Sequence, residues 1–271
     1  MQIRSYMPND IEGVRTLYEA RGLQFDPSLF QWKKQAPVQM SWVAEEEGVL
    51  YAHYAMIEMP FKPKARVAFA VDGIFHPERT TLPFIADMLE HALHWARDEA
   101  KLDAVMAFAN NKMGPVKRLL GWQPFGTYQA AQTNGNARGE ERLSLSPSLA
   151  DQQTSCSNSD YPSIYEAWRF LASPRRYHYM KGQERHYWFT ESQWLLSPVE
   201  DFMAEAVQLN EKTFHYMART REGISGKMTE KNPAQTEMWT PLYKPLSKQA
   251  EAWEPPPVWP FETVEGVTLG W

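Results

Sequence analysis

A carboxylate within an apolar run is the first feature of this sequence that could carry chemistry. Asp72 interrupts residues 65–75, "ARVAFAVDGIF", whose β-branched and apolar side chains are typical of a central strand. A carboxylate in a buried strand needs either a partner or a raised pKa, and both are common at functional sites. Asp72 is therefore a candidate general base, and the alternative is an acid that only accepts hydrogen bonds from loop amides.

The turn after this strand is the second candidate site. Residues 74–89, "IFHPERTTLPFIADML", begin like a strand and end like an amphipathic helix, with "TTLP" at 80–83 and no glycine between them. Helix N-termini at such turns bind phosphate, and glycine lets the backbone approach it closely, whereas Pro83 has no N–H to donate. The turn is either an anion site with a different set of donors, such as Arg79, or a structural helix start with proline in its first turn.

A segment of interleaved basic and aromatic residues, 168–188, is the third candidate. Aromatic rings can stack on bases or sugars while guanidinium groups bind phosphates. The candidate substrate or phosphate contacts are Arg175, Arg176, Tyr177 and Arg185. The alternative interpretation is the edge of an aromatic core with solvated charges.

Other chemistries lack the residues they need. The sequence has seven histidines and one cysteine, without a pair at zinc-ligand spacing. His91 and His94 share a helix face but have no nearby set of carboxylates or thiolates, and Cys156 lies in a Ser/Asn-rich loop. No Walker loop or G-x-G-x-x-G occurs. We therefore predict no metal site.

Hydrophobic periodicity in the first half predicts the element order β-α-α-β-β-β-α-β-α-β. The expected strands are 2–6, two strands within 41–61 that turn at Glu47-Gly48, then 65–75, 103–110 and 122–131; the expected helices are 11–18, 27–36, 82–100 and 111–121. Gly121 is a natural C-cap for the last helix.

Composition divides the chain into parts. Residues 1–132 are apolar and periodic, and 133–160 are rich in Ser, Asn, Gly and Gln, which indicates a polar linker or long loop. Residues 161–271 form a C-terminal extension, in which a capping serine, an early proline and late arginines predict a long helix at about 198–222. The Pro/Trp-rich tail that follows is expected to be extended and to pack on a surface.

Composition also limits the protein class. The chain has 271 residues, of which 43% are hydrophobic and 23% charged, and no apolar run approaches the roughly 18 residues of a membrane span. The N-terminus has no signal-peptide core, and a single Cys156 cannot form an internal disulfide, so we expect a cytoplasmic protein. A net charge of −5 argues against a generally basic nucleic-acid binder but not against a local patch.

The element order and two motifs resemble the GNAT superfamily of acyl-CoA-dependent N-acyltransferases. The motifs are "FHPE" at 75–78, which closes the fourth strand, and Asn110 with "LLGW" at 119–122, which closes the fourth helix. The resemblance covers residues 1–131. It implies an α/β (α+β) fold with a mixed, mostly antiparallel central sheet flanked by helices, here followed by a helical and aromatic extension.

In that family the helix after the turn presents backbone N–H groups to the CoA pyrophosphate. The candidate CoA contacts implied here are Phe75, Arg79, Thr80, Thr81 and Asn110. The family pattern V-x-P-x-Y-R-G-x-G, with Pro77 in register, places its arginine at Thr80 and its glycines at Thr81 and Pro83. Arg79 lies one residue before the position of the family's arginine, so the predicted phosphate-binding turn departs from the family pattern.

The resemblance also implies catalytic residues. The acceptor channel is lined by the central strands, which makes Glu58, Asp72 and His76 candidate bases. Many members protonate the CoA thiolate with a tyrosine four residues before the glycine of the "GW" ending, and Lys117 is at that place. An unperturbed lysine pKa of about 10.4 is a poor match to a thiolate of about 8.5 unless burial lowers it. The alternative for Lys117 is a solvated helix lysine.

Two functions follow from the resemblance. The first is direct transfer of an acyl group from acetyl-CoA or another acyl-CoA to an amine, by proximity and an amide oxyanion site. The second is a degenerate GNAT-like protein that does not use acetyl-CoA in the usual way. It would be a binding module, or a transferase that modifies nucleic acid or a nucleotide-linked substrate and contacts it through 168–188. The expected partner is thus a small-molecule amine or a nucleotide-linked substrate, and a homo-oligomer is compatible with either function.

Overall fold

The structure is a computed structural model, and its contacts divide the chain into two units. The first unit comprises Met1–Phe125 with Pro241–Glu254, and the second comprises Gly126–Thr240 with Pro255–Trp271. The residues described are 1–59, 65–109, 112–126, 128–135, 168, 172–174, 177–181, 186–190, 212–219, 238–239 and 241–255. No helix among these residues is long and apolar enough to cross a membrane.

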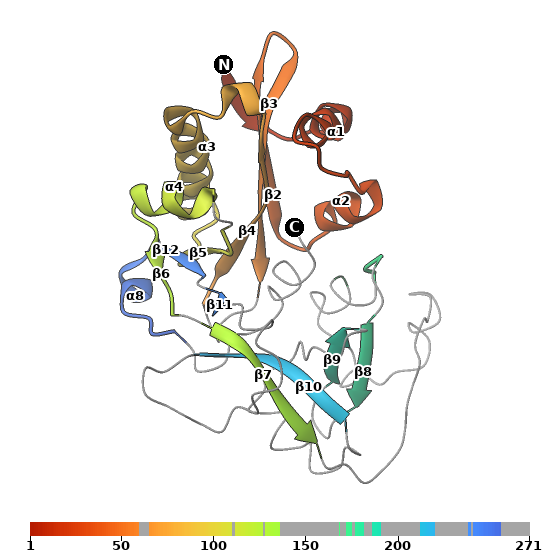
Figure 1. The fold of residues 1–271 in the computed structure, drawn as a ribbon. Coiled ribbons are helices and arrows are strands. Elements are labelled where there is room, and N and C mark those ends of the chain that lie inside the picture. Colours follow the sequence, from red (N-terminus) through yellow and green to blue (C-terminus); the bar gives the residue numbers. More distant parts are fainter. Residues whose placement is uncertain are drawn as a thin grey trace. The chain divides into compact units, whose positions relative to one another are not determined.

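The first unit contains a seven-stranded sheet with the order β1-β2-β3-β4-β5-β12-β6 (Figure 1). Its strands are β1 (Gln2–Ser5), β2 (Gln39–Glu46), β3 (Val49–Met59), β4 (Val67–Phe75), β5 (Ala104–Ala107), β6 (Gln123–Pro124) and β12 (Leu242–Pro245). Its helices are α1 (Ile11–Ala20), α2 (Pro27–Lys34), α3 (Leu82–His94), α4 (Met113–Leu119) and α8 (Lys248–Glu251), with 3-10 turns η1 (Pro8–Asp10) and η2 (Pro77–Arg79) and a π-helical turn η3 (Trp95–Glu99). Only β4 and β5 pair in parallel, so the sheet is mostly antiparallel, which confirms the predicted fold class.

Local sequence signals explain where these elements begin and turn. Asp26 caps α2 by accepting a hydrogen bond from the Leu29 amide at 3.0 Å, and Pro27 occupies the first helical position. Glu47 and Gly48, with φ of 52° and 80°, form the predicted turn between β2 and β3. The expected helices at 11–18, 27–36, 82–100 and 111–121 are confirmed as α1, α2, α3 with its π-helical turn, and α4.

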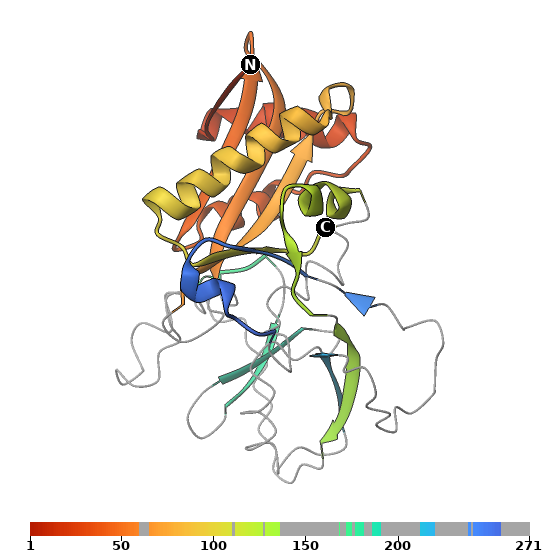
Figure 2. The same ribbon diagram turned by 90° about the vertical axis from the view of Figure 1, so that its left-hand side faces the viewer.

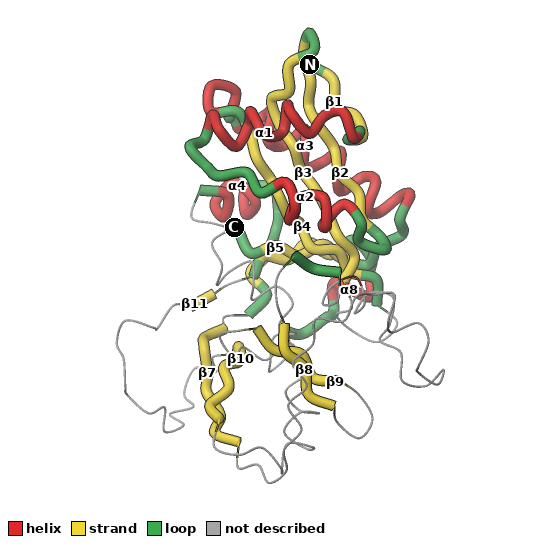
Figure 3. The backbone as a smooth tube through the Cα atoms, turned by 90° about the vertical axis from the view of Figure 1, so that its right-hand side faces the viewer, coloured by secondary structure: helices red, strands yellow, loops and turns green. Residues whose placement is uncertain are grey.

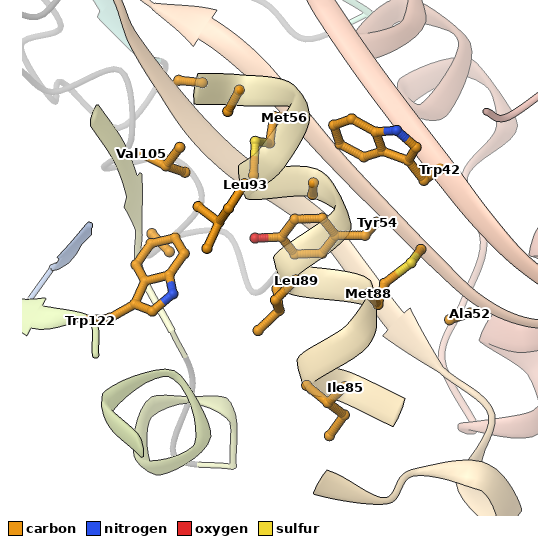
Figure 4. Packing of buried hydrophobic residues seen from close by; sticks show 14 of the residues in the cluster. Trp42, Ala52, Tyr54, Met56, Ile85, Met88, Leu89, Leu93, Val105 and Trp122 are labelled. Atoms are coloured by element: carbon orange, nitrogen blue, oxygen red, sulfur yellow. The ribbon is translucent and has the colours of Figure 1, made fainter. Parts of the chain in front are cut away.

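Helices cover both faces of the sheet. Helix α3 lies across one face (Figure 2), and α1 and α2 lie on the other (Figure 3). The α3 side holds a hydrophobic cluster, in which Trp42, Tyr54 and Met56 of the sheet pack against Met88 and Leu89 (Figure 4). Side chains alternate along β3, so the neighbour of Tyr54, His53, points to the α2 side.

The strand beside β5 comes from the far end of the chain. Leu242–Pro245 of β12 pairs antiparallel with Ala104–Ala107 of β5, and Leu242 and Tyr243 also pair with β6. The prediction of one final strand at 122–131 is therefore wrong: these residues are split between β6 and a strand of the second unit. Strands β6 and β12 are neighbours in the sheet although more than a hundred residues separate them in sequence.

The described residues of the second unit form two small sheets. Strand β7 (Tyr128–Gly135) pairs antiparallel with β10 (Lys212–Arg219) and β11 (Met238–Trp239), and β8 (Tyr177–Lys181) pairs with β9 (His186–Thr190). The predicted helix at 198–222 is wrong at residues 212–219, which form a strand. All eight of these residues pair with β7, and this pairing overrides their local preference for a helix. The boundary predicted after residue 132 falls inside β7.

Candidate active site

A β-bulge in β4 marks the centre of the candidate site. His53 pairs with Ile74 and Ala55 pairs with Val71, so Asp72 and Gly73 together oppose Tyr54. Asp72 has φ of 51°, a left-handed conformation that asparagine and aspartate tolerate better than most residues. The extra residue reverses the alternation of side chains along β4. Asp72 consequently points to the α2 side of the sheet.

Strand β4 separates from β5 just before this bulge. The parallel ladder joins Val67–Phe69 to Ala104–Met106 and ends there, while β4 continues to Phe75. The bulge therefore lies in the part of β4 that has left its neighbour. A bulge also frees main-chain groups from the regular ladder.

Lys117 of α4 approaches the bulge from the α3 side. Its Nζ atom donates a hydrogen bond of 3.1 Å to the Tyr54 hydroxyl and lies 3.9 Å from the centroid of the Trp122 ring. The Tyr54 ring in turn covers Gly73, where an added Cβ would lie 3.2 Å from Tyr54 Cδ2. Figure 4 shows the Tyr54 hydroxyl directed toward Trp122. Tyr54 thus connects Lys117 to the bulge.

Burial changes the acid–base properties of this pair. Only 4% of the Lys117 surface is exposed, and desolvation lowers the pKa of its ammonium group to about 7. Burial also raises the pKa of Tyr54, so its hydroxyl stays protonated. The sequence-based alternative of a solvated helix lysine is wrong. Lys117 is an amine that exchanges protons near neutral pH.

Asp72 has a buried cationic partner on the opposite side of the sheet. Its Oδ1 atom accepts a hydrogen bond of 2.6 Å from Nζ of Lys33 in α2, and both side chains are less than a tenth exposed. Burial alone would raise the pKa of Asp72, but the charge and hydrogen bond of Lys33, with the nearby His53 and Lys34, hold it below its usual range. A carboxylate with a lowered pKa is a weak base.

A second contact from α2 holds the backbone of the bulge. His53 Nδ1 lies 3.0 Å from the main-chain oxygen of Asp72, and Lys34 Nζ lies 3.0 Å from His53 Nε2. A carbonyl only accepts and an ammonium only donates, which assigns the proton of the neutral ring to Nδ1. Burial, followed by the charge of Lys34, lowers the pKa of His53 to about 3, so the ring remains neutral. Lys33 and Lys34 together fix the conformation of Asp72.

The turn between β4 and α3 offers few amides to an anion. Four of its amides already donate hydrogen bonds to protein acceptors: those of His76, Glu78, Arg79 and Thr81. Pro77 and Pro83 have no N–H. Among the described residues, the amides of this turn without an acceptor are those of Thr80, Leu82 and Phe84.

An arginine that the sequence analysis missed stabilises this turn. Arg21, at the end of α1, donates to the main-chain oxygen of Phe75 at 2.6 Å and to the hydroxyl of Thr80. The Thr80 hydroxyl in turn donates a hydrogen bond of 2.7 Å to the main-chain oxygen of His76. No local pattern around Arg21 indicates this role, because its partners lie more than fifty residues away in sequence.

The other predicted site residues have contacts of their own. Glu58 forms an ion pair with Arg66 and pairs with Ala68, toward the beginning of β4. His76 accepts from the Glu78 amide, and Arg79 pairs with Glu46 over the Tyr51 ring. Phe75 packs edge-on against Phe84, and Thr81 precedes α3 as its N-cap residue without a side-chain cap bond.

Several predicted contacts cannot be placed. Asn110, Arg175, Arg176 and Arg185 lie outside the described residues, and of Tyr177 only the backbone in β8 is described. Across the described ranges, no group of three or more His, Cys, Asp or Glu side chains could hold a metal ion.

Comparisons with known proteins identify the fold. Neither the protein-family models nor the curated proteins contain a match. Among solved structures, a GCN5-related N-acetyltransferase from Kribbella flavida matches with a TM-score of 0.61 and 10% identity, over 92% of this chain and 72% of that one. FeeM, an N-acyl amino acid synthase from uncultured soil microbes, matches with a TM-score of 0.39 and 20% identity, over 49% of this chain and 86% of that one. Together with the sheet order, the first of these likenesses shows that the chain has the GNAT acetyltransferase fold.

Proposed function

We propose that this protein is an N-acyltransferase that moves an acyl group from acyl-CoA to an amine. The observation that carries the proposal is the position of Lys117, a buried amine bonded to Tyr54, whose ring lies against Gly73 where β4 has separated from β5. Direct attack of an amine on a thioester needs the two reactants held together and the departing thiolate neutralised. The acyl thioester would lie beside the bulge.

Lys117 would protonate the departing thiolate. Its pKa of about 7 is below the value of about 8.5 typical of a thiol, so proton transfer from the ammonium to the thiolate is favourable. Tyr54 would orient the ammonium through its hydroxyl, and the Trp122 ring would stabilise the cation. Lys117 would thereby act as the general acid that neutralises the CoA thiolate near neutral pH.

The start of α3 would bind the diphosphate of CoA. The free amides of Thr80, Leu82 and Phe84 lie at the positive end of a thirteen-residue helix, and Arg79 is half exposed beside them. Three amides are fewer than a glycine-rich turn would provide. We therefore expect this helix start to bind CoA with lower affinity than a glycine-rich turn would.

Asp72 would position the bulge and not act as the base. Its carboxylate is paired with Lys33, its main-chain oxygen accepts from His53, and its side chain points away from the side that holds Lys117. Glu58 and His76 remain candidate bases. Glu58 accepts a hydrogen bond from Arg66, and His76 accepts one from the Glu78 amide.

The same turn supports a second candidate function, a GNAT-fold protein that binds another ligand. Four satisfied amides and two prolines leave little capacity for a diphosphate. Such a protein would be a binding module or would act on nucleic acid or a nucleotide-linked substrate through residues 168–188. Calorimetric titration of the full chain with acetyl-CoA, and in parallel with a short oligonucleotide, separates the two. Acetyl-CoA binding supports the acyltransferase, whereas salt-sensitive oligonucleotide binding without acetyl-CoA binding supports the alternative.

A further inference from the structure

Lys117 has the environment of a nucleophile as well as that of an acid. The side chain of this lysine is buried beside Tyr54 and Trp122, without a carboxylate in hydrogen-bond distance among the described residues. A lysine ammonium in such a place is not held in its charged form by an ion pair. Desolvation alone lowers the pKa of Lys117 to about 7, so an appreciable fraction is a neutral amine near pH 7.

The neighbouring titratable groups do not compete for this proton. Tyr54 is the titratable partner from β3, and burial raises its pKa. From α4 itself, Arg118 follows Lys117 in the last turn of the helix. From β12, Lys244 is engaged with the main-chain oxygen of Leu120 at 2.9 Å. The protonation state of Lys117 therefore depends chiefly on its burial.

We infer that Lys117 itself accepts the acyl group when acyl-CoA is bound and no acceptor amine is present. The inference rests on the proposed function, because it places the thioester beside Lys117. The neutral Nζ attacks the thioester carbonyl carbon, a C–N bond forms, and the C–S bond breaks. The thiolate leaves with its electron pair and takes up the proton that the new amide loses, so the products are Nε-acyl-Lys117 and free CoA.

Modification of Lys117 would remove the proposed proton donor. An amide nitrogen does not titrate near neutral pH and cannot protonate a thiolate. Self-acylation would thus inactivate the enzyme whenever acyl-CoA is abundant and acceptor is scarce. Acceptor amine would protect the enzyme by consuming the acyl group first.

Two other lysines of the first unit provide an internal control. Lys33 is paired with Asp72, and Lys34 donates to His53, both on the α2 side of the sheet. The pKa of Lys34 is also lowered, to about 8, chiefly by burial. A lowered pKa alone would modify Lys34 as well, whereas the inferred mechanism modifies Lys117 specifically.

Intact-mass measurement and peptide mapping test the inference. The full chain is incubated with acetyl-CoA without any amine, beside the variants Lys117→Arg and Lys34→Arg. We expect one acetyl group on Lys117 in the wild type and in Lys34→Arg, none at position 117 in Lys117→Arg, and a rate that rises about tenfold from pH 6 to pH 7.5. Acetylation spread over surface lysines, equal in all three proteins, would overturn the inference.

A panel of primary amines separates failure of this inference from failure of the proposed function. If amines are acetylated while Lys117 stays unmodified in their absence, self-acylation is wrong and the acyltransferase stands. If acetyl-CoA neither binds nor reacts, both are wrong. If Lys117 is modified and an amine from the panel slows its modification, both are supported.

Discussion

Nζ of Lys117 lies 3.1 Å from the hydroxyl oxygen of Tyr54, and this hydrogen bond connects α4 to a β3 side chain whose ring lies against Gly73 of β4. The contact places a titratable amine in the core cluster at the point where β4 has left β5. Burying that amine destabilises the protein when it is charged. We therefore expect the protein to be less stable with this lysine than with an apolar residue at position 117, at a gain in function.

Replacing Lys117 with methionine should stabilise the fold and abolish transfer. The pKa of Lys117 falls from 10.5 to about 7 on folding, so the unfolded chain binds more protons between these values. The wild type should therefore gain stability as pH rises through this range, and Lys117→Met should not. Near pH 7 the variant should be more stable by on the order of a few kcal/mol, measured by urea unfolding, with the difference shrinking toward alkaline pH. Equal stability at all pH values would contradict a lowered pKa.

Asp72 and Lys33 should tolerate joint neutralisation better than the loss of one partner. Asp72→Asn removes the carboxylate that forms an ion pair with the buried Lys33 ammonium and should cost about 3–5 kcal/mol of unfolding free energy. Asp72→Asn with Lys33→Met removes both charges and keeps a residue that accepts a left-handed backbone. We expect the double variant to recover most of the stability and to transfer acyl groups within about tenfold of the wild type. A double variant that is folded but inactive would return Asp72 to the role of general base.

A methyl group at Gly73 should disturb Lys117 without touching it. The new Cβ would lie 3.2 Å from the Tyr54 ring, which must move and lengthen its hydrogen bond to Lys117. We expect Gly73→Ala to lower kcat by at least about tenfold with little change in KM. Gly114→Ala is the matched control, because Gly114 is in α4 with no atom within 4 Å of an added Cβ. It should keep its activity, and equal losses in both variants would contradict the positioning role of Tyr54.

Restoring one amide to the turn should strengthen acyl-CoA binding. Pro83→Ala adds an N–H in the first turn of α3 beside the free amides of Leu82 and Phe84. A hydrogen bond to a charged phosphate contributes about 1.5–3 kcal/mol, so the dissociation constant measured by calorimetry should fall about tenfold or more. Leu82→Ala leaves the number of donors unchanged and should bind like the wild type. An unchanged affinity in Pro83→Ala would argue against diphosphate binding at this helix.

The end of α4 should depend on a residue from β12. Gly121 has φ of 78°, and an added Cβ would lie 2.9 Å from Nζ of Lys244, which caps α4 at Leu120. Gly121→Ala should cost about 1–2 kcal/mol of unfolding free energy through its backbone conformation. Because the Lys244 side chain can swing away, Lys244→Met should relieve little of that cost. Full recovery in the double variant would show that the clash, and not the left-handed backbone, is the cause.

Periodicity and turn chemistry could predict the helices and most strands of the first unit. The apolar spacing of α3, the turn at Glu47-Gly48 and the C-cap at Gly121 are local signals, and each is confirmed. Strand β12 could not be predicted from its neighbours, since its partners in β5 lie far back in the sequence. Its four residues, "LYKP", also do not differ in composition from the proline-rich tail around them, so no local pattern marks a strand.

The candidate site could be predicted only in part, because it too depends on contacts between residues that are distant in sequence. Strict alternation would place Asp72 on the α3 side, and only the bulge turns it toward Lys33; the glycine after it in an apolar strand was the available signal. The position of Lys117 followed from the resemblance, but its burial depends on Tyr54 and Trp122, which pattern alone does not bring together.

The release of thiol from acetyl-CoA in the presence of a panel of primary amines tests the central claim most directly. We predict that at least one amine drives thiol release by the wild type, with stoichiometric amide formation, and that Lys117→Met is slower by at least about a hundredfold at neutral pH although it is folded. Equal rates in the wild type and in Lys117→Met would contradict the role of Lys117. No release with any amine, together with no calorimetric binding of acetyl-CoA, would contradict the acyltransferase itself.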